Sequence, residues 1–133
     1  MKVLVGTDVQ PIDEVTASIK EFGTRYTQRL FTDHELENCG ENPVTAASGL
    51  AARFAAKEAV LKILDSSDTV PPWKSIEVRR DEVGRPEIVL DERTAEQAHR
   101  QGIIQMSVSL SHAGGMAIAT VVAQVSDDHS RSR

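Results

Sequence analysis

Apolar and polar residues recur along this chain with two periods, one typical of strands and one typical of helices. Short apolar or alternating runs predict strands at Lys2–Val5, Ser75–Arg80, Glu87–Leu90, Met106–Ser111 and Ala117–Val125. Stretches with helical spacing predict helices at Ile12–Phe22, around Leu36, from Gly49 to about Asp65, and over Asp91–Gly102. Because the helices fall between pairs of strands joined by turns, the pattern predicts an α+β fold with an antiparallel sheet packed against helices.

Capping and turn residues set several of these boundaries. Thr32 and Glu35 have the spacing of a capping box, which starts a short helix, and Gly40 is a natural end for it. We interpret the two side chains as a helix cap and nothing more. Asn42–Ser48 is predicted as a loop before the central helix. Pro86 predicts that its strand begins at a sheet edge or directly at the turn.

The predicted central helix carries an apolar stripe with charged residues beside it. On a projection of about 100° per residue, the stripe comprises Leu50, Phe54, Lys57, Leu61 and Leu64. Lys57 lies at the edge of the stripe and is predicted to extend its ammonium group towards solvent. Glu58 and Lys62 lie one turn apart beside the stripe. A surface ion pair worth about 0.2–0.5 kcal/mol explains that spacing by itself.

Two further motifs combine glycine with a residue that can do chemistry. The first strand is predicted to end in Gly6-Thr7-Asp8, and Gly6, which has no Cβ, lets another backbone or a ligand approach closely. Ser111 and His112 lie at a predicted tight turn before Gly114-Gly115. Each motif alone has an ordinary explanation: the aspartate as a turn former or helix cap, and the histidine as a solvated turn residue.

Composition excludes several classes of function. With 133 residues, 40% of them hydrophobic and 26% charged, the chain fits one ordinary globular domain. Its formal net charge of −5 argues against general nucleic-acid binding, which usually needs a basic face. No apolar run approaches the ~20 residues that span a bilayer, so no membrane segment is predicted. The single Cys39 cannot form an internal disulfide, which fits the cytoplasm, where we expect the protein to act.

Taken together and in this order, the motifs resemble the phosphopantetheinyl transferases, specifically the short holo-acyl-carrier-protein synthase type. That family has a Gly-x-Asp strand end, an aromatic-x-x-Lys-Glu-Ala-x-x-Lys helix and a Ser-His turn before its last strand. Here these are Gly6–Asp8, Phe54–Lys62 and Ser111-His112, and Arg29–Glu35 resembles the family's Arg-hydrophobic-hydrophobic-Thr-x-x-Glu helix entry. The resemblance spans about residues 3–125. We expect these residues to form one phosphopantetheinyl-transferase-like domain, which corresponds to one of the two halves that are fused in longer relatives. Residues 126–133 are expected to form a flexible tail.

The resemblance implies an enzyme that moves the 4′-phosphopantetheine arm of coenzyme A onto a serine hydroxyl of an acyl or peptidyl carrier protein. The other product is 3′,5′-ADP. Mg²⁺ prefers one or two carboxylates together with phosphate oxygens and waters, and we assign Asp8 and Glu58 to the metal. Lys62, one turn past Glu58, is placed to donate to the pyrophosphate as a mobile charge. These three residues are the predicted catalytic set.

Binding of the coenzyme is assigned to a second set of residues. The resemblance implies that Arg53 and His112 hold the 3′-phosphate of the adenosine. Ser111 and the backbone of Gly114-Gly115 add donors at the predicted turn. Lys62 completes the set at the pyrophosphate.

The predicted first helix departs from the family pattern. Relatives commonly carry basic residues there that meet an acidic carrier protein, whereas this chain has Asp13 and Glu14, which repel such a partner. Arg25 and Arg29 remain as nearby positive charges. Whether the carrier serves fatty acid biosynthesis or a specialised pathway is therefore left open. Similar short transferases are trimers with coenzyme A between subunits, so a homotrimer is expected.

Two other classes of function remain open from the sequence alone. One is a module of the same fold that binds coenzyme A or a carrier protein without catalysis. The retained Asp8, Glu58 and Lys62 argue against it. The other is a different coenzyme A enzyme, such as an acetyltransferase. The chain has no Arg-x-x-Gly-x-Gly/Ala loop opening a helix, which argues against that class.

Overall fold

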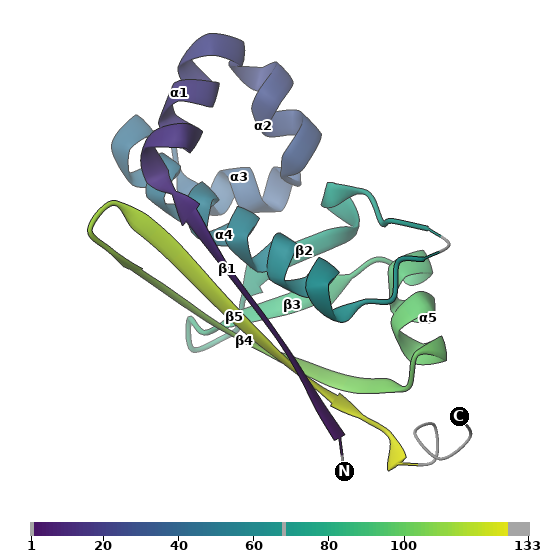
Figure 1. Cartoon of the computed structure of the whole chain (residues 1–133). Helices are drawn as coiled ribbons and strands as arrows, with labels where there is room; N and C mark the ends of the chain where they lie inside the picture. The colour runs from purple at the N-terminus through teal and green to yellow at the C-terminus, as the bar shows by residue number, and fades with distance from the viewer. Residues whose placement is uncertain (1, 68, 128–133) are drawn as a thin grey trace.

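Two antiparallel sheets and a set of helices form the fold (Figure 1). The computed structural model describes residues 2–67 and 69–127. The larger sheet has the strand order β1-β5-β4, and the smaller one pairs β2 with β3. The strands are β1 (Lys2–Pro11), β2 (Ile76–Arg80), β3 (Pro86–Leu90), β4 (Ile103–Ala113) and β5 (Met116–Val125). The helices are α1 (Ile12–Phe22), α2 (Thr24–Leu30), α3 (Asp33–Cys39), α4 (Pro43–Ile63), the 3₁₀ turn η1 (Trp73–Ser75) and α5 (Glu92–Arg100). The predicted α+β fold with antiparallel sheets is confirmed.

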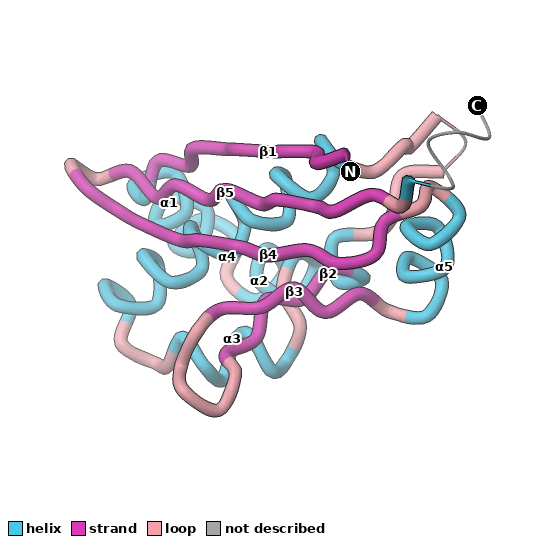
Figure 2. Tube along the Cα trace, turned by 90° about the horizontal axis from the view of Figure 1, so that it is seen from below, coloured by secondary structure: helices cyan, strands magenta, loops and turns pink. Residues whose placement is uncertain are grey.

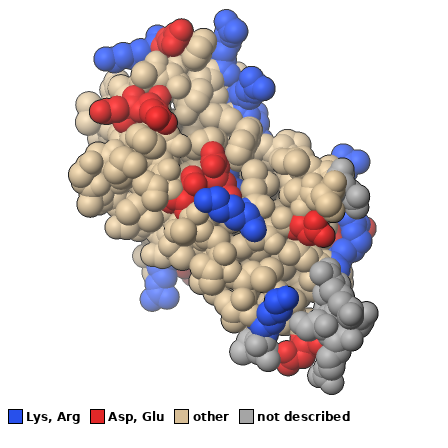
Figure 3. All heavy atoms as spheres, viewed as in Figure 1, with Lys and Arg blue, Asp and Glu red and all other residues tan. Residues whose placement is uncertain are grey.

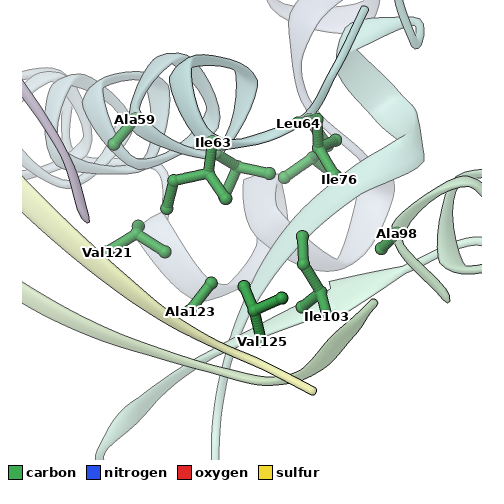
Figure 4. Packing of buried hydrophobic residues seen from close by; sticks show 10 residues of the cluster. Ala59, Ile63, Leu64, Ile76, Ala98, Ile103, Val121, Ala123 and Val125 are labelled. Atoms are coloured by element: carbon green, nitrogen blue, oxygen red, sulfur yellow. The ribbon is translucent and has the colours of Figure 1, made fainter. Parts of the chain in front are cut away.

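Helix α4 is the centre of the hydrophobic core. Seven alanines of α4 and three of β5 are buried, so the helix packs closely on the sheet without large side chains between them. Larger side chains fill the space at the C-terminal end of α4 (Figure 4), where Ile63 and Leu64 meet Val121 and Val125 of β5. The predicted single stripe was too narrow, because α4 is buried around most of its circumference, Ala51 and Ala55 included.

Strand β1 touches α4 backbone to backbone at Gly6. A Cβ built on Gly6 would lie 2.2 Å from the carbonyl oxygen of Ala59, closer than any real contact. Only glycine fits there, which confirms the prediction that another backbone approaches at this position. The contact fixes where the residues after Gly6 lie along α4.

The helices lie on one side of the three-stranded sheet, as Figure 2 shows. Along β1 the inward positions are Leu4, Gly6 and Asp8, whereas Val3, Val5 and Val9 point outwards and are 48–63% exposed. On the neighbouring β5, Val122 is 39% exposed on the same outer face. The described residues therefore leave one face of this sheet open and partly apolar.

A fully buried ion pair joins α4 to α3. Lys57 Nζ lies 2.8 Å from Glu35 Oε1, and neither side chain has any exposed surface. Burial lowers the pKa of the Lys57 ammonium, and the charge of Glu35 opposes this effect. The prediction that Lys57 reaches solvent was therefore wrong. The capping box of Thr32 and Glu35 is confirmed, but Glu35 does more than cap.

Several boundaries differ from the sequence prediction for local reasons. Strand β1 continues to Pro11 because β5 offers a partner along its whole length. Helix α4 begins at Pro43, inside the predicted loop, because the Asn42 side chain accepts from the next backbone N–H groups and Pro43 fits the first turn. Helix α2 was not predicted; Gly23, with φ of 58°, separates it from α1. The predicted tail lies outside the described residues from 128 onwards.

Candidate functional site

Asp8, Glu58 and Lys62 come together where β1 crosses α4. Lys62 Nζ lies 3.1 Å from Asp8 Oδ1 and donates a 2.6 Å hydrogen bond to the carbonyl oxygen of Thr7. Asp8 lies within β1 rather than at its end, opposite Ala119 of β5. Figure 3 shows acidic and basic atoms side by side near the middle of this face. Lys62 of α4 thus forms its ion pair with Asp8 of β1. A surface pair of Glu58 and Lys62 along the helix, which would explain their spacing, does not by itself describe the site.

The two carboxyl groups of the site lie close enough to interact directly. Burial raises the pKa of Glu58, and the charge of Asp8 and a hydrogen bond with its side chain raise it further, while Lys62 opposes the shift. A carboxyl group whose pKa is raised by burial and by a neighbouring carboxylate marks a site with surplus negative charge, which a cation would relieve. The donors of both carboxyl groups are oxygens, as Mg²⁺ requires.

Asp8 and Glu58 offer two carboxylate ligands and no more. Among residues 2–67 and 69–127, no group of three or more His, Cys, Asp or Glu side chains is arranged to hold a metal ion. A site with two carboxylates fits a metal that takes its remaining ligands from phosphate oxygens and waters, which is how Mg²⁺ is usually held. Asp8 and Glu58 are the residues that fit this role.

Arg53 and His112 line a second site, a cavity of about 540 Å³. Arg53 is only 3% exposed, and its Nη1 donates to the carbonyl oxygen of Gly49 at 3.2 Å. Its Nε is buried without a hydrogen-bond partner among the described residues. Arg80 of β2 also lines the cavity. Two guanidinium groups and an imidazole around one cavity, with a buried donor unsatisfied, favour a phosphate ligand.

Ser111 and His112 are placed differently from the prediction. Both belong to β4, which continues to Ala113, and the turn itself is Gly114-Gly115 with φ values of 58° and 77°. Neighbouring strand residues point to opposite faces, so His112 shares the face of Leu110 while Ser111 shares the outer face. Both residues line the cavity nonetheless.

Arg80 and Cys39 line the cavity but were not among the sequence candidates. Arg80 donates a 2.8 Å hydrogen bond to the carbonyl oxygen of Gly84, which holds its guanidinium at the end of the β2–β3 hairpin. Burial raises the pKa of the Cys39 thiol, so it stays protonated and unreactive. The alternation of β2 gave no signal that Arg80 would line the same cavity as residues of α4.

The two sites open on different sides of α4. Arg53 and Glu58 are five residues apart, which corresponds to a rotation of about 140° around the helix. The structure therefore brings together Asp8, Glu58 and Lys62 as one group and Arg53, Ser111 and His112 as another. The predicted site residues form two clusters, each built around residues of α4.

Comparisons with known proteins identify the family of this chain. The sequence model of the 4′-phosphopantetheinyl transferase superfamily matches residues 4–121. The chain is similar to the holo-[acyl-carrier-protein] synthase of Ruminiclostridium cellulolyticum, with 33% identity over 96% of each chain. It is 41% identical to the synthase of Dehalococcoides mccartyi, over 90% of this chain and 96% of that protein.

One of the similar solved structures contains bound coenzyme A. The fold is similar to the crystal structure of Helicobacter pylori holo-[acyl-carrier-protein] synthase in complex with coenzyme A. The TM-score is 0.76 at 26% identity, with 91% of this chain and 100% of that chain covered. No helix within residues 2–67 and 69–127 is long and apolar enough to cross a membrane. The chain belongs to the 4′-phosphopantetheinyl transferase superfamily, and within it to the enzymes of the short holo-[acyl-carrier-protein] synthase type.

Proposed function

We propose that this enzyme transfers the 4′-phosphopantetheine arm of coenzyme A to a serine hydroxyl of an acyl carrier protein by a Mg²⁺-dependent reaction that releases 3′,5′-ADP. The transfer between coenzyme A and a carrier is the activity of its family. The observation that carries the finer proposal is the pairing of Asp8 with Glu58 beside Lys62. We assign the activity to one domain, residues 3–125.

Asp8 and Glu58 would hold the metal. When bound, Mg²⁺ neutralises charge on the pyrophosphate and on the leaving phosphate. Lys62 is 53% exposed, so its flexible ammonium can move from Asp8 to a pyrophosphate oxygen when substrate arrives. The carrier's serine oxygen bonds to the β-phosphorus as the bridging P–O bond breaks. Its proton passes to a water, and the electron pair of the broken bond leaves with 3′,5′-ADP.

The adenosine end of coenzyme A is proposed to occupy the 540 Å³ cavity. The buried Arg53, with one donor unsatisfied, is suited to the 3′-phosphate, and His112 and Arg80 reach the same space. Ser111 lines its rim. The alternative function, a binding module without catalysis, would need the same cavity but gives no reason for the close pairing of the Asp8 and Glu58 carboxyl groups, which raises the pKa of Glu58.

A homotrimer is proposed for two reasons. The site residues lie on two sides of α4, and the outer face of the three-stranded sheet is open. The outer valines of β1, Val3, Val5 and Val9, form an apolar strip that a second copy would cover. A neighbouring subunit would then add residues beside the coenzyme.

The carrier protein is proposed to dock near α1 and α2. Figure 3 shows acidic side chains over α1, whose first turn carries Asp13 and Glu14. Beside them, Arg25 and Arg29 line a cavity of about 340 Å³ that also contains Tyr26. This mixed charge favours a carrier less acidic than usual at the point that meets α1. We expect the reaction to take place in the cytoplasm, in fatty acid biosynthesis or a specialised pathway.

The first prediction tests the reaction and its metal. An apo acyl carrier protein incubated with coenzyme A, Mg²⁺ and this enzyme should gain the mass of the 4′-phosphopantetheine arm, measured on the intact protein. Removing Mg²⁺ with a chelator should stop the gain. Asp8→Ala and Glu58→Ala should each lower the rate by about 100-fold or more, and the double variant should be little worse, because the two act as a unit. An unchanged carrier mass would support the binding module, and an acetyl increment the acetyltransferase.

The second prediction tests the 3′-phosphate site. His112→Ala should raise the KM for coenzyme A by roughly ten- to a hundredfold, the loss of a charge-assisted hydrogen bond, with a smaller effect on kcat. Wild type should use 3′-dephospho-coenzyme A less well than coenzyme A, and His112→Ala should largely lose that preference. His99→Ala, on the exposed surface of α5, is the matched control. If the His112 variant still discriminates as sharply as wild type, His112 does not contact the phosphate.

The third prediction concerns carrier docking. Asp13→Lys with Glu14→Arg should speed association with strongly acidic carriers, most clearly at low salt, and leave the turnover step nearly unchanged. Glu92→Lys with Glu96→Arg makes the same charge change on α5 and should have little effect. Stopped-flow association rates at two ionic strengths measure the difference. Equal rates for both double variants would place docking elsewhere.

The fourth prediction concerns assembly. Light scattering should give wild type a mass three times that of the 14.5 kDa chain. Val5→Lys, at a valine that is 63% exposed on the open sheet face, should give a folded monomer with little activity. Val83→Lys, at a valine that is 74% exposed outside this face, should remain trimeric. A monomeric wild type with full activity would contradict the shared site.

A further inference from the structure

Lys57 belongs to the central motif, yet the proposed reaction does not use it. Its ammonium has three N–H donors, and three acceptors surround it: Glu35 Oε1 at 2.8 Å, the carbonyl oxygen of Trp73 at 3.0 Å, and the carbonyl oxygen of Ile76. The ring of Phe31 lies 5.7 Å from the same ammonium. Every donor of this buried lysine is therefore used inside the protein.

Glu35 is satisfied to the same degree. One carboxylate oxygen accepts from the backbone N–H of Thr32 at 3.0 Å, and the other accepts from the backbone N–H of Val78 at 2.9 Å. The pair thus connects the start of α3, the middle of α4, η1 and β2. Burying two charges is costly, and an apolar pair of similar volume would often serve stability equally well. A role beyond stability accounts better for this arrangement.

The position of the pair along α4 indicates what that role is. Lys57 holds one side of the helix towards α3 and β2, and two residues later Ala59 meets Gly6 of β1 on another side. Glu58 lies between these two contacts. Because consecutive residues differ by about 100° around a helix, fixing Lys57 and Ala59 determines where the Glu58 side chain points.

We propose that Lys57 and Glu35 are positioning residues, which fix the rotation of α4 so that the Glu58 carboxylate faces Asp8. The inference rests on the proposed metal site and deepens it. The pair itself touches neither metal nor substrate. It acts through Glu58, in the way that outer residues orient the ligands of metal sites.

The test uses a variant that leaves no unpaired charge in the protein interior. Lys57→Met alone would leave the Glu35 carboxylate unpaired and would unfold part of the protein. In Glu35→Gln/Lys57→Met both charges are removed together, so the fold should persist. Mn²⁺, a spectroscopic substitute for Mg²⁺, should bind this double variant about tenfold more weakly than wild type, as measured by the electron paramagnetic resonance of free Mn²⁺. The KM for Mg²⁺ should rise by a similar factor.

A core variant distant from the site is the control for lost stability. Val125→Ala removes packing from β5 in the cluster around the end of α4 and should lower the melting temperature while leaving Mn²⁺ affinity unchanged. If the double variant binds Mn²⁺ as tightly as wild type, the ion pair has no positioning role and the inference is overturned.

The proposed metal site and this inference can fail separately. If wild type and Asp8→Ala bind Mn²⁺ equally, the metal assignment is wrong. A crystal structure of the double variant then decides the positioning claim. Glu58 turned away from Asp8 would support positioning, whereas an unchanged contact between the two carboxyl groups would overturn it.

Discussion

The close contact between Gly6 and Ala59 is the constraint on which the site depends. Side chains alternate along a strand, so Asp8, two residues after Gly6, points to the same side as Gly6 and faces α4. Glu58 precedes Ala59, and Lys62 lies one turn beyond Glu58. A single backbone contact therefore sets the register that brings three charged side chains from two elements together. Any side chain at Gly6 would push β1 away from the helix and separate them.

The rest of the core is built so that α4 can lie this close. The alanines on the facing sides of α4 and β5 keep the layers thin, and larger side chains pack around the two ends of the helix, with Leu50 near its start and Ile63 and Leu64 at its end. The helix carries functional residues in two directions: Glu58 and Lys62 towards β1, and Arg53 towards the cavity lined by His112. A substrate with a reactive pyrophosphate and a distant phosphate suits this division. Charge is neutralised at one end, and binding energy is gained at the other.

The sequence was informative where the chemistry depends on short motifs. Gly6-Thr7-Asp8, Phe54–Lys62 and the Ser111-His112 pair identified the family, and the periodicity predicted all five strands. The extent of β1 and β4 could not be predicted, because it depends on the matching length of β5. The burial of Lys57 could not be predicted either. A lysine is expected at the surface, and its burial depends on Glu35 and on carbonyl groups 16 and 19 residues away. Arg80 reaches its cavity only through tertiary packing.

The most direct test of the account is a crystal structure with Mn²⁺ and coenzyme A, using the anomalous signal of manganese. One strong anomalous peak is expected between the carboxylates of Asp8 and Glu58, beside the pyrophosphate, with Lys62 turned from Asp8 to a phosphate oxygen. The 3′-phosphate is expected in the cavity between Arg53 and His112. A manganese peak away from these carboxylates, or an adenosine outside that cavity, would contradict it.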